Sequence, residues 1–446
     1  MIGPFFAFLI VIILLILLYR SQDLKQKIIY FDNNATTKMC NESVQEYSKR
    51  LHFFANPSSS YSIGRECKRI IDDNLRQISR CLKCDKFGQI IPTSCSTESN
   101  NIIIHAFATK FPNYDILTTP VEHASIRYPV QCLYESKGKS PTNAEAQQTL
   151  VVDNYGEIQL DSLVKKLTPA METDGNNWVM DKPGNKKVSL VTVIWGNNEI
   201  GTLQPIHQIA DICQKFKVPL HIDATQIIGR YDVNLDDLFA LGVTSFSFSS
   251  HKFHGPKGCG FLVVRKDLVE FLKNYQLMSG GKQFDNLRPG TENLPAICAS
   301  RVALEKSVEN LPYKIKHVTE LRKKLLDGIL KIFDKSVRIN TNITESKSLY
   351  NTLNVCLCGL DSRKLMKYFE KIGIFFGVGS ACSKAGESSV LLNIGCTKQQ
   401  ELGAVRLSLS HENTVKEIEI FLYHLAIIKR NLENNKIFSK NPPYNT

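Results

Sequence analysis

The sequence has few of the patterns that indicate nucleic-acid-binding, metal-binding or extracellular proteins. No stretch interleaves basic with aromatic residues, although the formal net charge is +12. The charge therefore indicates a mostly solvated surface, with attraction to a membrane face or an acidic partner as the alternative. Cys81 and Cys84 form a CxxC pair without a second pair at zinc spacing, and we expect no metal site. The 13 cysteines are scattered and odd in number, which favours reduced thiols over a disulfide framework.

What the sequence does contain is the composition of a large globular protein. Its 446 residues are enough for two domains and a sizeable core. The share of hydrophobic residues is 43% and that of charged residues 22%, so neither disorder nor a fibrous structure is indicated. No internal repeat is apparent.

The N-terminus carries a long apolar run. Met1–Tyr19 contains no charged side chain, and Phe5–Tyr19 is apolar or aromatic throughout. A helix needs about 20 such residues to cross a membrane, so the run just suffices. It lacks the basic start and cleavage site of a signal peptide and the arginines of a transit peptide. Because Arg20, Lys25 and Lys27 follow directly, we expect a single-pass membrane anchor with the rest of the chain in the cytosol.

Beyond the anchor, apolar β-branched runs alternate with helical patterns. Buried strands are predicted at Val188–Ile194, Pro219–Asp223, Thr244–Ser249 and Gly260–Val264, with a helix at Ile206–Phe216 between the first two. This alternation favours an α/β domain with a mainly parallel sheet. In such sheets ligands bind outside the carboxyl ends of the strands, so polar residues at those ends are the candidates for chemistry.

Two further segments bear on the domain organisation. The polar, strand-poor stretch Thr168–Lys187 is rich in turn signals and is predicted to be a surface insertion. A helical pattern at Leu311–Phe333 is expected to begin a second domain. The tail after Asn434 is expected to be frayed.

Lys252 and Asp223 are the candidates at two of the predicted strand ends. Lys252 follows Thr244–Ser249 and lies among small hydroxylated residues and a glycine-rich turn, where a lysine can form a covalent imine with an aldehyde cofactor. The alternative is a solvated loop lysine. Asp223 ends an apolar strand, and a buried carboxylate there needs a cation or a hydrogen-bond donor, such as a protonated pyridine nitrogen. The alternative for Asp223 is a helix cap.

Other polar residues each have a functional and an ordinary interpretation. Thr93–Asn101 can cradle a phosphate at a helix start or simply cap that helix. Asn198 can donate to a phenolate oxygen or form a turn, and His123 can stack on an aromatic ring or be solvated. Cys382, near a lysine in a small-residue loop, can be a nucleophilic thiolate or an inert thiol. Arg406, in an apolar strand, needs a carboxylate from either the protein or a substrate.

Together and in this order, these blocks resemble the NifS/IscS-like cysteine desulfurases of the class V aminotransferase group. The resemblance covers about residues 28–430. It is carried by the runs Asp32–Thr37, Asn56–Ser59, Thr97–Asn100, Glu122–His123, Asn197–Gly201, His221–Gln226, Ser249–Lys252, Arg288–Asn293 and Gly379–Cys382.

The resemblance implies a PLP-dependent transferase of fold type I, with a large domain around a mainly parallel sheet and a smaller α+β domain. One N-terminal transmembrane helix would precede them. The expected boundaries are the anchor at 1–20, a linker at 21–27, the large domain at 45–305, the small domain at 28–44 and 306–435, and a tail at 436–446.

The resemblance also implies a reaction and its catalytic residues. Lys252 would hold pyridoxal 5′-phosphate (PLP) and move protons at the substrate Cα, and Asp223 would pair with the pyridinium nitrogen. His123 would stack on the ring and act as an acid or base. Cys382 would attack the sulfur of L-cysteine, leaving a persulfide on the enzyme and releasing alanine. The sulfur would pass to an acceptor protein, such as an iron–sulfur scaffold.

Further binding residues follow from the same resemblance. Those expected to bind cofactor or substrate are Asn198 and Gln226 at the ring oxygen, Ser96, Thr97, Ser249 and His251 at the phosphate, and Asn34 and Arg406 at the carboxylate of cysteine. Thr291 matches a position that reaches the phosphate of a partner subunit, so a homodimer is expected.

The sequence departs from the family pattern at several positions around these motifs. Cys95 and Ser250 stand where glycine is usual, Lys282 interrupts a glycine triplet, His411 replaces an arginine and Tyr61 replaces a histidine. A selenocysteine lyase, another class V enzyme and a non-catalytic membrane scaffold are the alternatives. The presence of a cysteine in the Gly379–Cys382 run argues against a plain aminotransferase.

Overall fold

The computed structural model describes residues 28–135, 149–168, 172–174, 177–179, 188–379 and 388–433. The expected anchor and linker, Cys382 and the C-terminal tail lie outside these residues. Among the described residues, no helix is long and apolar enough to cross a membrane.

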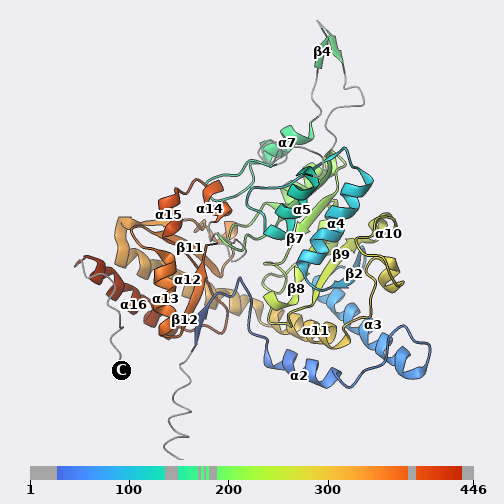
Figure 1. The fold of residues 1–446 in the computed structure, drawn as a ribbon, viewed down its shortest axis with the longest axis horizontal. Coiled ribbons are helices and arrows are strands. Elements are labelled where there is room, and N and C mark those ends of the chain that lie inside the picture. Colours follow the sequence, from blue (N-terminus) through green and yellow to red (C-terminus); the bar gives the residue numbers. More distant parts are fainter. Residues whose placement is uncertain are drawn as a thin grey trace, which may run out of the picture.

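A six-stranded sheet forms the centre of the larger part of the molecule (Figure 1). Its strands β3, β6, β7 and β8 run parallel, β9 is antiparallel to β8, and β2 is antiparallel to β9. The four predicted strands and the helix between the first two are confirmed to within one residue. In spatial order the strands are β2 (Gly88–Thr93), β9 (Gly260–Arg265), β8 (Val243–Ser249), β7 (Leu220–Asp223), β6 (Val188–Ile194) and β3 (Asp115–Leu117).

Helices cover both faces of this sheet, which is why strands such as β6 are buried along nearly their whole length. One face packs against α4 (Ser96–Lys110), α5 (Ala124–Glu135) and α10 (Val269–Lys273). The other packs against α3 (Ser62–Leu82), α7 (Leu160–Leu167), α8 (Ile206–Lys215), α9 (Leu235–Ala240) and α11 (Leu294–Val308). Helix α2 (Asn41–Arg50) lies on α11.

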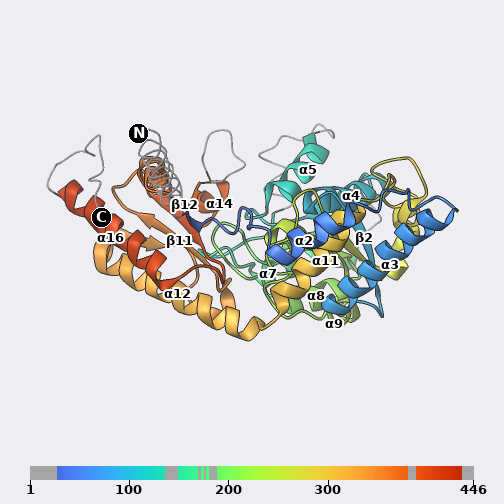
Figure 2. The ribbon, with the colours of Figure 1, turned by 90° about the horizontal axis from the view of Figure 1, so that it is seen from below.

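A second sheet forms the smaller domain, beside the first (Figure 2). Its strand order is β1 (Ile29–Phe31), β12 (Ile374–Val378), β13 (Ala404–Ser408), β11 (Thr352–Leu357) and β10 (Val337–Ile339). Helices α12 (Leu311–Phe333), α13 (Ser362–Lys371) and α16 (Val415–Glu433) pack on it and form a separate core. The helix predicted at Leu311–Phe333 is confirmed.

Two short strands and two short α-helices remain among the described residues. The stretch predicted to be poor in strands contains, among its described residues, one two-stranded antiparallel ribbon of β4 (Glu172–Asp174) and β5 (Asn177–Val179), which was not predicted. Helices α14 (Ser389–Asn393) and α15 (Lys398–Leu402) precede β13.

Candidate active site

A cavity of about 260 Å³ lies where the carboxyl ends of the large-domain strands meet the small domain. It collects residues from the ends of β6, β7 and β8, the starts of α4 and α5, and small-domain strand β13. The predicted site residues that line it are Asn34, Ser96, Thr97, His123, Asn198, Asp223, Gln226, Ser249, His251, Lys252 and Arg406. Thr291 is exposed and outside this lining, and Cys382 is not among the described residues.

Lys252 is a buried amine rather than a solvated loop lysine. It ends a single 3₁₀ turn directly after β8, and its Nζ atom donates to the main-chain oxygens of Asn34 at 2.5 Å and Ala35 at 2.9 Å. Burial, together with the positive charges of Arg230 and Arg406 and against the charges of Asp223 and Asp32, lowers the pKa of the amine to about 7. A substantial fraction is therefore uncharged near neutral pH, the form that attacks a carbonyl carbon.

Asp223 is held at the end of β7 by hydrogen bonds to both carboxylate oxygens. Its Oδ1 accepts from the amide of Thr225 at 3.0 Å, and its Oδ2 accepts from Asn100 Nδ2 at 3.1 Å. Residues 225–230 form turns, so Asp223 does not cap a helix. Asn100 in turn accepts from His221 Nε2 at 2.9 Å and from Ser247. This buried network fixes a carboxylate that faces the cavity.

His123 lies in the loop before α5 and is bound to the same network. Its Nδ1 and Ser125 Oγ share a hydrogen bond of 2.8 Å, and Asn100 Nδ2 donates to Ser125 Oγ at 2.8 Å. Burial lowers the pKa of the imidazole, which Asp223 opposes and the charge of Lys252 reinforces. The ring is therefore neutral at physiological pH, so its ring nitrogens can accept as well as donate a proton.

The start of α4 forms the opposite end of the cavity. The amide of Ser96 donates to Ser249 Oγ at 2.7 Å, and this hydroxyl donates to Ser96 Oγ at 3.1 Å. The first amides of a 15-residue helix and these hydroxyls suit an anion such as phosphate. Gly260 makes the close approach possible, since a Cβ there would lie 2.6 Å from the Cα of Cys95. His251 also lines this end and bonds Thr36 Oγ1 at 3.1 Å.

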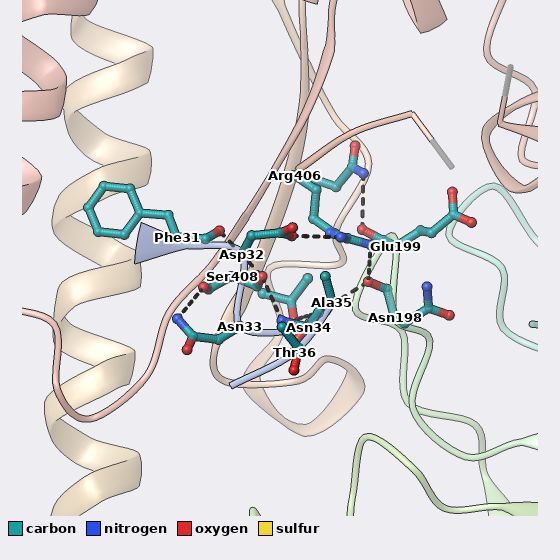
Figure 3. A network of polar contacts seen from close by, with 12 residues as sticks. Phe31, Asp32, Asn33, Asn34, Ala35, Thr36, Asn198, Glu199, Arg406 and Ser408 are labelled. Atoms are coloured by element: carbon teal, nitrogen blue, oxygen red, sulfur yellow. Dashed lines mark hydrogen bonds and ion pairs between the residues drawn. The ribbon is translucent and has the colours of Figure 1, made fainter. Parts of the chain in front are cut away.

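Arg406 enters the cavity from β13 already paired with a protein carboxylate (Figure 3). Its Nη2 lies 2.7 Å from Asp32 Oδ1, and its Nη1 donates to the main-chain oxygen of Asn198 at 3.2 Å. Of the two partners that the sequence left open for this arginine, the structure supplies the protein one. Its Nε is buried and has no hydrogen-bond partner among the described residues, so one donor of the guanidinium is unsatisfied in this arrangement.

The amide side chains of Asn34 and Gln226 are hydrogen-bonded to other groups of the protein. Asn34 Nδ2 donates to Thr352 Oγ1 at 2.8 Å, and its Oδ1 accepts from Arg230 Nη1 at 3.0 Å. Gln226 Nε2 donates to the main-chain oxygen of Asn34 at 3.1 Å, and its Oε1 accepts from Arg230. These amides therefore join the two domains behind Lys252.

Several residues of the site were not predicted from the sequence. Asn100 and Arg230 are hydrogen-bonded to predicted site residues. Asn100 follows Ser96 by four positions and Arg230 follows Gln226 by four, which is about one helical turn. This spacing could have identified both residues. Glu122, Glu199 and Thr225 also line the cavity and lie inside runs that carry the family resemblance, although no role was assigned to them, whereas Arg127 lies outside those runs. The hydroxyl of Thr225 and one carboxylate oxygen of Glu122 are buried without a hydrogen-bond partner among the described residues.

Comparison with known proteins identifies the family. The aminotransferase class-V family model matches residues 29–173 and 179–421. A cysteine desulfurase IscS from Clostridium botulinum is 32% identical over 421 residues, covering 92% of this chain and 97% of that protein. Another from Methanosarcina thermophila is 31% identical, with coverages of 92% and 94%.

The solved structures agree with the sequence comparison. A NifS-like protein superposes with a TM-score of 0.75 and 30% identity, covering 90% of this chain and 99% of that chain. A NifS-like protein from Rickettsia africae gives a TM-score of 0.74 at 27% identity, with coverages of 90% and 99%. The chain belongs to the class-V aminotransferase family and is one of its NifS/IscS-like cysteine desulfurases.

Proposed function

We propose that this protein converts L-cysteine to L-alanine and takes the sulfur as a persulfide on Cys382, with PLP bound to Lys252. The observation that carries the proposal is the buried amine of Lys252, whose pKa is lowered to about 7 inside a cavity shared by both domains. A lysine amine with a lowered pKa is suited to bind an aldehyde covalently, and burial is the main cause of the lowered pKa. Membership of a PLP-dependent family supports the same cofactor.

The residues present fit PLP at both ends of the cavity. The helix start at Ser96 and the hydroxyl of Ser249 suit its phosphate, together with Thr97 and His251. The buried, unpartnered hydroxyl of Thr225 offers a further donor beside Asp223. When bound, the cofactor supplies an electron sink for the pair left behind as the substrate Cα loses its proton.

The chain's own groups then orient and protonate the reactants. Asp223, held by two hydrogen-bond donors, would pair with the ring nitrogen of the cofactor. Asn198 and Gln226 would donate to the ring oxygen, which requires Gln226 to release the main-chain oxygen of Asn34. His123 would lie against the ring and, being neutral, would hold or release a proton there. Lys252 would move the proton at the substrate Cα.

Arg406 and Cys382 deal with the substrate itself. Arg406 keeps one nitrogen on Asp32 and offers the remaining donors of its fork to the cysteine carboxylate, with Asn34 beside it. The Cys382 thiolate attacks the substrate sulfur, so an S–S bond forms as the C–S bond breaks. The carbon fragment takes up a proton and leaves as alanine. A thiol acceptor or reductant then removes the sulfur.

We further propose a homodimer, a sulfur-acceptor protein and a membrane anchor. Thr291 is exposed and outside the cavity lining, as expected of a side chain that acts on a partner subunit's cofactor. The apolar run Phe5–Tyr19, followed by Arg20, supports a single-pass anchor that leaves the catalytic domains in the cytosol.

One experiment tests the activity. The purified protein is assayed for the visible absorbance of bound cofactor and for alanine and sulfide formed from cysteine with a reductant. Lys252→Ala should lose the bound-cofactor absorbance, whereas Cys382→Ser should retain it and release no sulfide. Sulfide release by Cys382→Ser at the parent rate would disprove the persulfide mechanism. A parent protein without cofactor absorbance would instead indicate a non-catalytic scaffold, and faster turnover of selenocysteine a lyase.

A further inference from the structure

The start of α14 is hydrogen-bonded to two charged residues in the wall of the cavity. Arg127 Nη1, on α5, donates to Ser389 Oγ, with 2.7 Å between the two atoms. The neighbouring hydroxyl, Ser388 Oγ, donates to Glu199 Oε2 at 2.6 Å. Arg127 and Glu199 both line the cavity. Two adjacent serines of the small domain are therefore each hydrogen-bonded to the large domain in the cavity wall.

Ser388 is also hydrogen-bonded to other residues of the small domain. Ser388 caps α14 by accepting from the amide of Leu391 at 3.1 Å, and its own amide donates to Glu401 on α15. Apolar side chains of α14 also pack against Val121 and Ile200 of the large domain. Apolar packing alone therefore joins α14 to the large domain, and the two hydrogen bonds also fix the orientation of α14 there.

Those polar contacts use groups that are costly to bury. Burial raises the pKa of the Glu199 carboxyl, although the hydrogen bond from Ser388 and the charges of Arg406 and Arg127 oppose it. The Nε of Arg127 is buried without a hydrogen-bond partner among the described residues. Buried charges seldom stabilise a fold more than apolar side chains of the same size, and directional specificity is the better-attested reason for keeping them.

We propose that Arg127 and Glu199 form a clamp on Ser388 and Ser389 that positions the sulfur-transfer step, an inference that rests on the proposed function. Ser388 follows Cys382 by six residues in the sequence. A chain of that length reaches at most about 20 Å, so the fixed point at Ser388 bounds where the nucleophile can act. Misplacing a reacting group by about 1 Å can cost about 100-fold in rate.

The test compares clamp variants with a matched contact elsewhere between the domains. Arg127→Leu and Ser389→Ala should each slow single-turnover persulfide formation on Cys382 about tenfold, with the KM for cysteine and the cofactor absorbance unchanged. The double variant should be no slower than Arg127→Leu. The control is Lys347→Ala, which removes the 3.0 Å contact of Lys347 Nζ with Glu157 Oε1, and it should retain the parent rate.

Alkylation of Cys382 by iodoacetamide, followed by mass spectrometry, gives a readout that needs no turnover. We expect its rate to change in Arg127→Leu and Ser389→Ala but not in Lys347→Ala. Equal alkylation rates in all variants would overturn the clamp even if the parent protein is an active desulfurase. A raised KM with unchanged kcat would also overturn it, because Arg127 would then be a substrate-binding residue. Failure of the proposed function appears separately, as a parent protein that forms no persulfide.

Discussion

The amine of Lys252 lies 2.5 Å from the main-chain oxygen of Asn34. Asn34 belongs to the segment that leaves small-domain strand β1 and crosses to the large domain, whereas Lys252 follows large-domain strand β8. The position of the reactive amine therefore depends on the contact between the two domains. Burial in that contact is the first reason why the pKa of Lys252 falls to about 7.

This pKa predicts how the cofactor-free protein takes up PLP. Only the uncharged amine attacks the aldehyde, so we expect the uptake rate, followed by absorbance, to rise with pH through about 7 and then level off. The unfolded chain binds more protons between pH 7 and 10.5, so this lysine makes folding more favourable as pH rises over that window. A midpoint for uptake near pH 10 would contradict the buried amine.

Glu122 predicts a pH dependence of opposite sign. Burial raises the pKa of its carboxyl to about 8, against hydrogen bonds from Thr119 and the main chain of Ile194. The folded protein thus holds the proton that the unfolded chain loses above about 4.5, and this contribution to stability is lost as pH rises to about 8. We expect Glu122→Gln to flatten the fall in unfolding free energy between pH 5 and 8, measured by urea denaturation. An unchanged slope would show that Glu122 titrates normally.

Arg406→Lys tests the forked contact at the substrate end. A guanidinium can bind Asp32 and a substrate carboxylate with different nitrogens, whereas an ammonium is a single point of charge. We expect the KM for cysteine to rise about tenfold, equivalent to about 1.4 kcal/mol, with the cofactor absorbance unchanged. The control is Arg338→Lys, a small-domain arginine that bonds the main chain at Gly395 and does not line the cavity. An equal rise in KM for the control would rule out a specific role for Arg406.

Deletion of residues 1–20 tests the anchor without touching the site. The described residues begin at Ile28 and form both cores without this segment, so we expect a soluble and active truncated protein. The full-length chain should sediment with membranes and be released by detergent. Recovery of the full-length protein in the soluble fraction would contradict the anchor.

Local patterns were sufficient for four strands of the large sheet and for the polar residues at their ends. Val188–Ile194 is rich in β-branched and apolar residues and is buried from Ser189 to Ile194 because helices cover both faces of its sheet, and that run alone predicted β6. Asp223 and Lys252 were found because polar residues directly after such runs fall at one edge of the sheet. The ribbon β4–β5 was missed because its two short strands carry little apolar periodicity.

Apolar runs along the chain were enough to locate four strands and the polar residues that follow them, and the combined order of the motifs was enough to identify the family. The partners of those polar residues follow from the folded arrangement alone. Arg406 pairs with Asp32 and Lys252 meets Asn34 across hundreds of residues of sequence, because β1 joins the small sheet while the following segment crosses to the large domain. Such contacts depend on how two separately formed cores pack together, which no local pattern encodes.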